Sequence, residues 1–80
     1  MSVKLVFLGK LADLAGAPAK DVPGPLDWPG LLHALPGPLG EAVKSEKVKL
    51  GLNGTVVPDK TALAASDGDE VALLPPVSGG

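Results

Sequence analysis

The residues that could do chemistry lie at the end of the chain, which closes with Pro75-Pro76-Val77-Ser78-Gly79-Gly80. Because Ser78 is small and Gly79 and Gly80 carry no side chain, this segment could thread a narrow channel in another protein. The group it would deliver is the carboxylate of Gly80, which becomes reactive only once a leaving group such as AMP is attached. The alternative is a frayed terminus or a cloning remnant with no role.

The rest of the chain lacks the residues for a second catalytic or metal-binding site. It has no cysteine and one histidine, which excludes thiolate metal sites and any Ser-His or Cys-His nucleophile. That residue, His33, is expected to be a partly exposed helix residue. The segment 54–61 resembles a phosphate-binding loop, but Asp59 replaces the glycine before Lys60, and a carboxylate there repels phosphate. We therefore predict no metal, no bound cofactor and no catalytic machinery in this chain alone.

Composition narrows the class of protein further. Eighty residues with 45% apolar content suffice for one small domain with one core. A net charge of −2 and only two aromatic residues argue against nucleic-acid binding. The sequence shows neither a membrane-spanning run nor a signal-peptide pattern, so we expect a cytoplasmic protein without a membrane partner. The late acidic residues lack EF-hand spacing and are expected on a solvated or partner-facing surface: Asp59, Asp67, Asp69 and Glu70.

Hydrophobic periodicity predicts the elements that must carry the tail. Strands are expected at 3–8, 17–22, 48–53, 55–57 and 70–74, and Asn53-Gly54 predicts a type I′ hairpin. A short helix is expected over 11–15, where Leu11 and Leu14 share helical spacing. A second should run from the N-cap Asp27 to the proline at 36, burying three leucines. A loop at 36–40, further helical turns at 41–47 and a turn or 3₁₀ segment at 62–64 complete the prediction.

This order of elements is typical of a small α+β roll, in which short helices cover one face of a mixed sheet. The first and last strands are expected to lie side by side at the centre, which would make them parallel. We divide the chain into a domain of residues 1–74 and an extended tail of residues 75–80. Fully extended, that tail reaches about 20 Å.

Several segments resemble the small subunit of molybdopterin synthase, a family of ubiquitin-like sulfur carriers. The stretch from Val3 to Gly16 is similar to the first strand and helix of that family, and Leu52-Asn53-Gly54 is similar to its hairpin. From Asp67 to Gly80 the chain is similar to the terminal signature of the family nearly throughout. The likeness is weakest over 23–47, and no arginine stands near Ala12, where some relatives place one.

The resemblance implies a β-grasp fold and a reaction cycle on Gly80. A ubiquitin-activating-type adenylyltransferase would use ATP to adenylate Gly80, and a sulfur-donating enzyme would turn it into a thiocarboxylate. The large subunit of molybdopterin synthase would take in the tail, within a heterotetramer. The sulfur would pass to cyclic pyranopterin monophosphate during molybdenum cofactor biosynthesis. This chain would be the non-catalytic sulfur donor, and the activating partner would bind the ATP.

The outward-facing apolar residues gain a role from this resemblance. If the other faces of the first and last strands fill the core, then Val6, Leu8 and Leu74 point outward beside the root of the tail. With residues 75–77 they would form a partner interface. Alternatively, loops or a helix of this chain cover them.

Three other functions remain open at this point. The chain could carry sulfur to thiamine thiazole or to tRNA instead. It could be a ubiquitin-like protein modifier that is conjugated to lysines through Gly80. It could also be a purely non-covalent interaction module, for which the tail would be dispensable.

Overall fold

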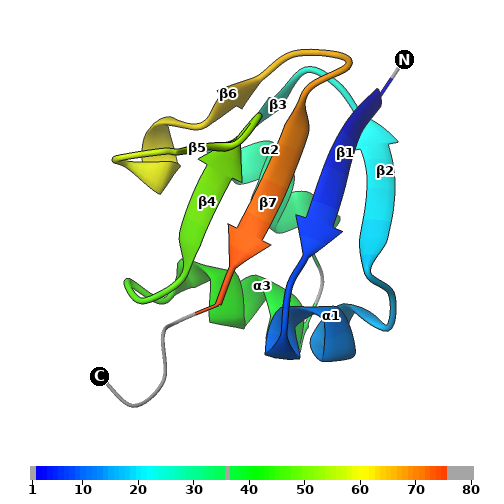
Figure 1. Cartoon of the computed structure of the whole chain (residues 1–80), viewed down its shortest axis with the longest axis vertical. Coiled ribbons are helices and arrows are strands. Elements are labelled where there is room, and N and C mark those ends of the chain that lie inside the picture. Colours follow the sequence, from blue (N-terminus) through cyan, green and yellow to red (C-terminus); the bar gives the residue numbers. More distant parts are fainter. Residues whose placement is uncertain (1, 36, 76–80) are drawn as a thin grey trace.

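The structure is a computed structural model that describes residues 2–35 and 37–75, built around a five-stranded mixed sheet (Figure 1). Its strands are β1 (Ser2–Phe7), β2 (Ala19–Pro23), β4 (Lys49–Leu52), β5 (Thr55–Val56) and β7 (Glu70–Leu74), in the spatial order β2-β1-β7-β4-β5. Strands β1 and β7 are parallel, with Leu5 opposite Val71, and the other pairs are antiparallel. The predicted parallel pairing of the first and last strands is confirmed.

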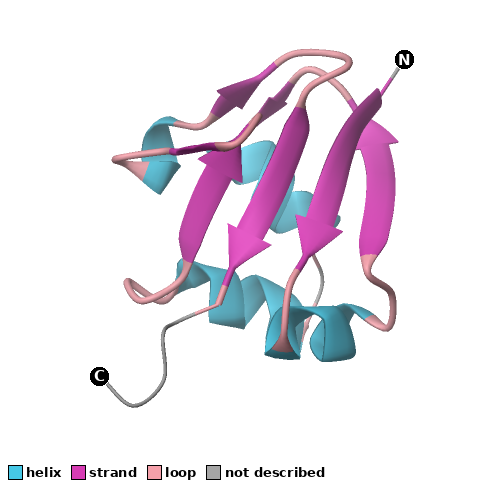
Figure 2. Cartoon of the chain, in the orientation of Figure 1, coloured by secondary structure: helices cyan, strands magenta, loops and turns pink. Residues whose placement is uncertain are grey.

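The helices are short and lie on one side of this sheet or beyond its end. They are α1 (Lys10–Ala15), α2 (Trp28–Ala34), α3 (Pro38–Lys44) and the 3₁₀ helix η1 (Lys60–Ala62). Figure 2 shows α2 behind the sheet and α1 and α3 beyond the ends to which β1 and β7 point. A second sheet pairs β3 (Leu26–Asp27) with β6 (Ala64–Ala65). No helix in the described ranges is long and apolar enough to span a membrane.

Local sequence signals explain where α1 and α2 begin and end. The Asp27 carboxylate accepts a hydrogen bond of 2.8 Å from the N–H of Gly30, and Pro29 occupies the first turn of α2, where its missing donor costs nothing. Helix α1 ends at Gly16, whose φ of 75° is the left-handed cap conformation that glycine favours. Both boundaries were predicted.

The core lies between the sheet and the helices. Alternate residues of β1 and β7 point into it and are fully buried, as are Leu50 of β4, Leu31 of α2 and Val43 of α3. Burying one such side chain contributes about 1.5–3 kcal/mol relative to leaving it exposed. The buried hydrophobic side chains among the described residues are Val3, Leu5, Phe7, Leu11, Val22, Leu26, Leu31, Leu35, Leu39, Val43, Val48, Leu50, Leu63, Ala65, Val71 and Leu73. These residues form one cluster and come from most of the strands and helices, so the main sheet packs against the helices through a single face.

Three details of the prediction were wrong. Helix α3 begins at Pro38, inside the expected loop, because a proline at the start of a helix forfeits no hydrogen bond. The 3₁₀ helix η1 covers Lys60–Ala62 and not 62–64, because the Asp59 side chain caps it two residues earlier. The β3–β6 pair was missed, because two-residue strands carry no periodicity to detect.

Candidate functional site

Within the described residues, the candidate site consists of the root of the tail, where β7 ends at Leu74 and Pro75 follows. Of the residues predicted to act, Pro76, Val77, Ser78, Gly79 and Gly80 lie outside the described residues. The other four are Val6, Leu8, Leu74 and Pro75. The predicted boundary between domain and tail, after residue 74, stays a prediction.

Val6 lies on the face of the sheet opposite the core. It follows buried Leu5 and precedes buried Phe7 on β1, so strand alternation directs its side chain away from the core. Helix α2 lies on the core side of the sheet (Figure 1). The pairing register sets four small or β-branched apolar residues in a row across this open face: Val6, Ala72, Gly51 and Val56. Val56 is 55% exposed, and Val6 is half-buried. The row forms a shallow apolar strip across the centre of the sheet.

Leu74 extends this strip to the root of the tail. It pairs with Lys49 of β4, and a Cβ built on Gly51 would lie 3.9 Å from its Cδ1 atom. On the other side of β7, Leu8 follows the end of β1 and is 41% exposed. The three predicted interface residues of the domain are therefore on the open face or at its edge, and the described helices do not cover that face (Figure 2).

The opposite end of β7 is held by a polar clasp, which we define as Asn53, Asp69 and the backbone N–H groups they bind. The Asn53 side chain accepts a hydrogen bond of 2.9 Å from the N–H of Glu70 and donates one of 3.1 Å to Asp69. The second oxygen of Asp69 accepts a bond of 2.8 Å from the N–H of Ser66. This Ser66 bond, and then the Asn53 bond, lower the pKa of Asp69. Asp69, predicted to be a solvated or partner-facing acid, is thus a structural acceptor.

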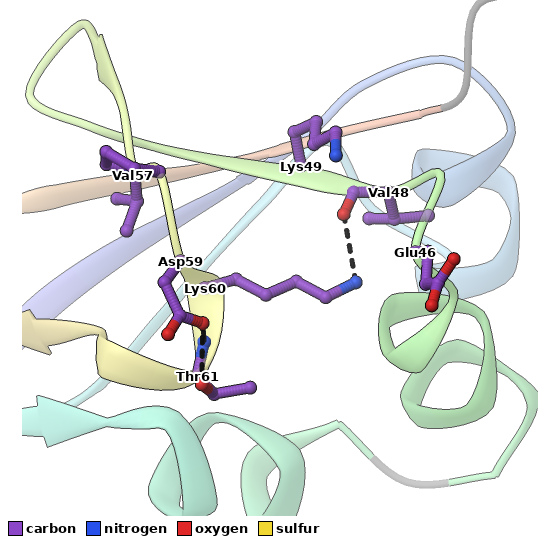
Figure 3. A pocket seen from close by; sticks show the side chains of 8 residues that line it. Glu46, Val48, Lys49, Val57, Asp59, Lys60 and Thr61 are labelled. Carbon is purple, nitrogen blue, oxygen red and sulfur yellow. Dashed lines mark hydrogen bonds between the residues drawn. The ribbon is translucent and has the colours of Figure 1, made fainter.

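A cavity of about 370 Å³ opens between the α3–β4 connection and η1 (Figure 3). Lys60 extends across it and donates hydrogen bonds to the carbonyls of Val43 at 2.8 Å, Val48 at 3.0 Å and Ser45. Those three acceptors use all three N–H groups of an ammonium, so Lys60 has none left for a ligand. Burial, and then the charge of Lys49, lower the pKa of Lys60.

The same segment was considered as a phosphate-binding loop because of Asp59 and Lys60. The Asp59 carboxylate accepts hydrogen bonds from the Thr61 N–H at 3.0 Å and hydroxyl at 2.6 Å, which lower its pKa. It thereby caps η1, while Lys60 holds the end of α3 and stands 5.7 Å from the centroid of the Trp28 ring. Both polar side chains therefore serve the fold. Within residues 2–35 and 37–75, no three His, Cys, Asp or Glu side chains group to hold a metal, and His33 is exposed on α2.

Two roles were missed when only the sequence was considered. Asn53-Gly54 was interpreted as a turn signal, and Asn53 does have a positive φ of 50°, but its side-chain bonds reach residues 16 and 17 positions away. Lys60 was considered only as a ligand for phosphate. No local pattern indicates either set of bonds, because the partners are distant in the chain and meet only in the folded domain.

The chain resembles proteins of known structure over its whole length. The ThiS family model matches residues 5–80. The chain is similar to the HVO 2177 protein of Haloferax volcanii, at 26% identity over 100% of this chain and 87% of that one, with a TM-score of 0.78. It is similar to a chain from the complex of subunits 1 and 2 of molybdopterin-converting factor from Helicobacter pylori, at 25% identity over 100% of both chains, with a TM-score of 0.68.

It is also similar to SAMP1 from Haloferax volcanii, at 28% identity over 100% of both chains, with a TM-score of 0.64. No curated protein matches the chain in sequence. These likenesses, together with the parallel β1–β7 pair, confirm the predicted β-grasp fold.

Proposed function

This chain belongs to the ThiS family of ubiquitin-like sulfur carriers, and on that premise we propose that it is the sulfur-carrier subunit of a molybdopterin synthase. The observation that carries the proposal is where the tail begins. Strand β7 lies in the middle of the sheet, beside an uncovered apolar face, and is followed in the sequence by a six-residue tail that ends in Gly-Gly. A partner that docks on this face would lie within reach of the tail, which spans at most about 20 Å. The likeness to the Helicobacter pylori chain supports the choice of pathway.

The proposed chemistry takes place on the carboxylate of Gly80. A carboxylate oxygen attacks the α-phosphorus of ATP on a ubiquitin-activating-type adenylyltransferase, and pyrophosphate leaves. Hydrosulfide released by a sulfur-donating enzyme then attacks the carbonyl carbon, the acyl–phosphate bond breaks and AMP leaves, and loss of a proton gives the thiocarboxylate. The thiocarboxylate is largely ionised at neutral pH and is a competent nucleophile, like an activated thiolate. Its sulfur attacks an oxygen-bearing carbon of cyclic pyranopterin monophosphate, so that a carbon–sulfur bond forms as a carbon–oxygen bond breaks. Water then cleaves the acyl–sulfur bond, which leaves the sulfur on the pterin and restores the carboxylate.

The domain would contribute binding and orientation to this cycle. Val6, Leu8 and Leu74 would dock against the large subunit, with Pro75 and the following two residues continuing the contact. Gly79 and Gly80 would enter the active site of the large subunit, because they lack the Cβ atoms that a narrow channel excludes. The large subunit would supply the catalytic groups, and the activating enzyme would supply the ATP site. We place this complex in the cytoplasm, as a heterotetramer.

The experiment is intact mass spectrometry of the chain after incubation with its cognate adenylyltransferase, ATP and a sulfide source. We expect the mass gain of one sulfur replacing one oxygen, located at Gly80. Deleting Gly80 should abolish the gain and leave the fold intact. A matched control adds one alanine after Gly80. It keeps every residue of the chain but converts the carboxylate of Gly80 into a peptide bond. Sulfur loading of either altered chain would contradict the proposal.

Transfer to the acceptor is a separate test. The thiocarboxylated chain, mixed with the large subunit and cyclic pyranopterin monophosphate, should lose its sulfur and yield the dithiolene product. Loss of sulfur only to a thiazole synthase or to a tRNA-thiolating enzyme would instead establish one of those pathways.

A second candidate function is favoured by the likeness to SAMP1, which is a small archaeal modifier protein. In that case the Gly80 adenylate would be attacked by a lysine ε-amine of another protein, AMP would leave, and an isopeptide bond would form. Peptides that carry a Gly-Gly remnant on lysine, found in cells that express this chain and missing when Gly80 is deleted, would support it.

A further inference from the structure

The turn between β1 and α1 contacts the root of the tail. Strand β1 ends at Phe7, and the chain turns at Gly9, whose φ of 56° and ψ of −131° favour glycine. A Cβ built on Gly9 would lie 3.4 Å from Cγ of Pro75 and 4.0 Å from its Cβ. The pyrrolidine ring therefore packs against the backbone of Gly9, and Pro75 is half-buried.

The turn itself is fixed by hydrogen bonds. The carbonyl of Leu8 accepts a bond of 3.1 Å from the N–H of Leu11, and the carbonyl of Gly9 accepts one of 3.1 Å from the N–H of Ala12. These bonds start α1 immediately after β1. Because β1 and β7 are parallel neighbours, their C-terminal ends lie at the same end of the sheet. The turn after β1 therefore lies beside the residue that follows β7.

We propose that Gly9 and Pro75 form a seat, defined as the packing of the Pro75 ring on the Gly9 turn, which sets the direction in which the tail leaves the domain. The inference rests on the proposed function, since it assigns a positioning role in the delivery of Gly80. Leu74 is the last residue of β7 paired to β4, so the ladder gives no direction beyond it. The ring fixes φ of Pro75, and its packing orients that residue relative to the sheet.

The seat also limits how far the tail can reach. Five residues follow Pro75, and five residues span at most about 18 Å. The reacting atoms of any partner must therefore lie within that distance of the seat. Fixing the first residue of the tail in the unbound protein reduces the conformational entropy lost on threading, which strengthens binding without touching the chemical step.

The test measures KM and kcat for thiocarboxylate formation with the cognate adenylyltransferase, ATP and a sulfide source. Pro75→Ala removes the ring, and Gly9→Ala forces the turn out of its conformation. Gly16→Ala is the matched control, because Gly16 also has a positive φ of 75° and flanks α1, but a Cβ there would meet nothing within 4 Å. We expect KM to rise about three- to tenfold in the first two variants, with kcat unchanged, and to stay at the wild-type value in the control.

Double variants sharpen the result. Because Gly9 and Pro75 act on one contact, combining their substitutions should raise KM no further than the stronger single change. Combining Pro75→Ala with Gly16→Ala should leave the effect of Pro75→Ala unchanged. Since Pro75 lies outside every helix and strand, Pro75→Ala carries the test even if Gly9→Ala fails to fold.

Failure of the seat is distinguishable from failure of the proposed function. If the wild-type chain is loaded with sulfur and Pro75→Ala has the wild-type KM, the seat is overturned while the function stands. If the wild-type chain is never loaded, the function fails. The seat is then decided by nuclear Overhauser contacts between the Gly9 α-protons and the Pro75 ring protons. Their absence overturns the seat, and their presence supports it.

Discussion

The two ends of strand β7 are held in opposite ways. At its start, the Asn53–Asp69 clasp and the bond of 3.0 Å from the Lys4 N–H to the Asp69 carbonyl fix the register by directional hydrogen bonds. At its end, beyond the backbone pairing of Leu74 with Lys49, the side chains at the root of the tail make apolar contacts, with Pro75 on Gly9 and Leu74 beside Gly51. Apolar contacts can be extended to a partner without leaving a donor or acceptor unpaired, whereas polar ones cannot. The strand is anchored where it starts and free to engage a partner where it ends.

The two faces of β7 provide the largest test of this comparison. Leu73 is fully buried, and its neighbour Leu74 is half-buried on the open face. Leu73→Ala should lower the free energy of unfolding by about 2–5 kcal/mol, since it leaves a cavity in the core. Leu74→Ala should lower it by less than about 0.5 kcal/mol but weaken large-subunit binding. Urea unfolding followed by Trp28 fluorescence measures the first effect, and titration calorimetry the second. Equal losses of stability would mean that the two faces are not distinct.

The polar clasp should contribute less than the core. Asn53→Ala removes two side-chain hydrogen bonds and places an alanine at a positive φ, which alanine adopts less readily than asparagine. We therefore expect the free energy of unfolding to fall by about 1–2 kcal/mol. Asn53→Gly is the control, because it keeps the turn conformation and loses only the bonds. If Asn53→Gly were as stable as the wild type in the same urea titration, the clasp would contribute nothing and the residue would be needed only for the turn.

The smallest effect should be seen in acid. The folded-state pKa of Asp69 is lowered, so its carboxylate stabilises the fold above its unfolded pKa of about 3.9, and that contribution is lost as the pH falls through the folded value. Asp69→Asn should therefore lower the urea midpoint at neutral pH and show a shallower decline below about pH 4. Asp21→Asn is the control, because it removes the same charge at an exposed position of β2. Parallel acid limbs for Asp69→Asn and the wild type would contradict the assignment.

Much of the fold follows from local pattern. The alternation in β1 and β7 places their buried residues correctly, and the capping of α2 by Asp27 follows from one side chain at one position. The clasp and the seat do not follow, because each joins residues distant in the chain. Asn53 and Asp69 are 16 positions apart, and Gly9 meets Pro75 only because β1 and β7 run parallel. Periodicity shows which face a residue occupies and is silent on which residue stands beside it.

The proposal that the Gly80 carboxylate is the reactive group rests on composition and residue order alone. A chain with no cysteine, one histidine and a Gly-Gly terminus offers few other candidates, and absence of a residue type is fully visible in a sequence. The platform for that group is a different matter. Strand order and register decide which neighbours surround that platform. They leave the face that carries Leu74 open, bring Asp69 to the clasp and bring Pro75 against Gly9. Order and register are set by cooperative packing of the whole core, which no single segment encodes.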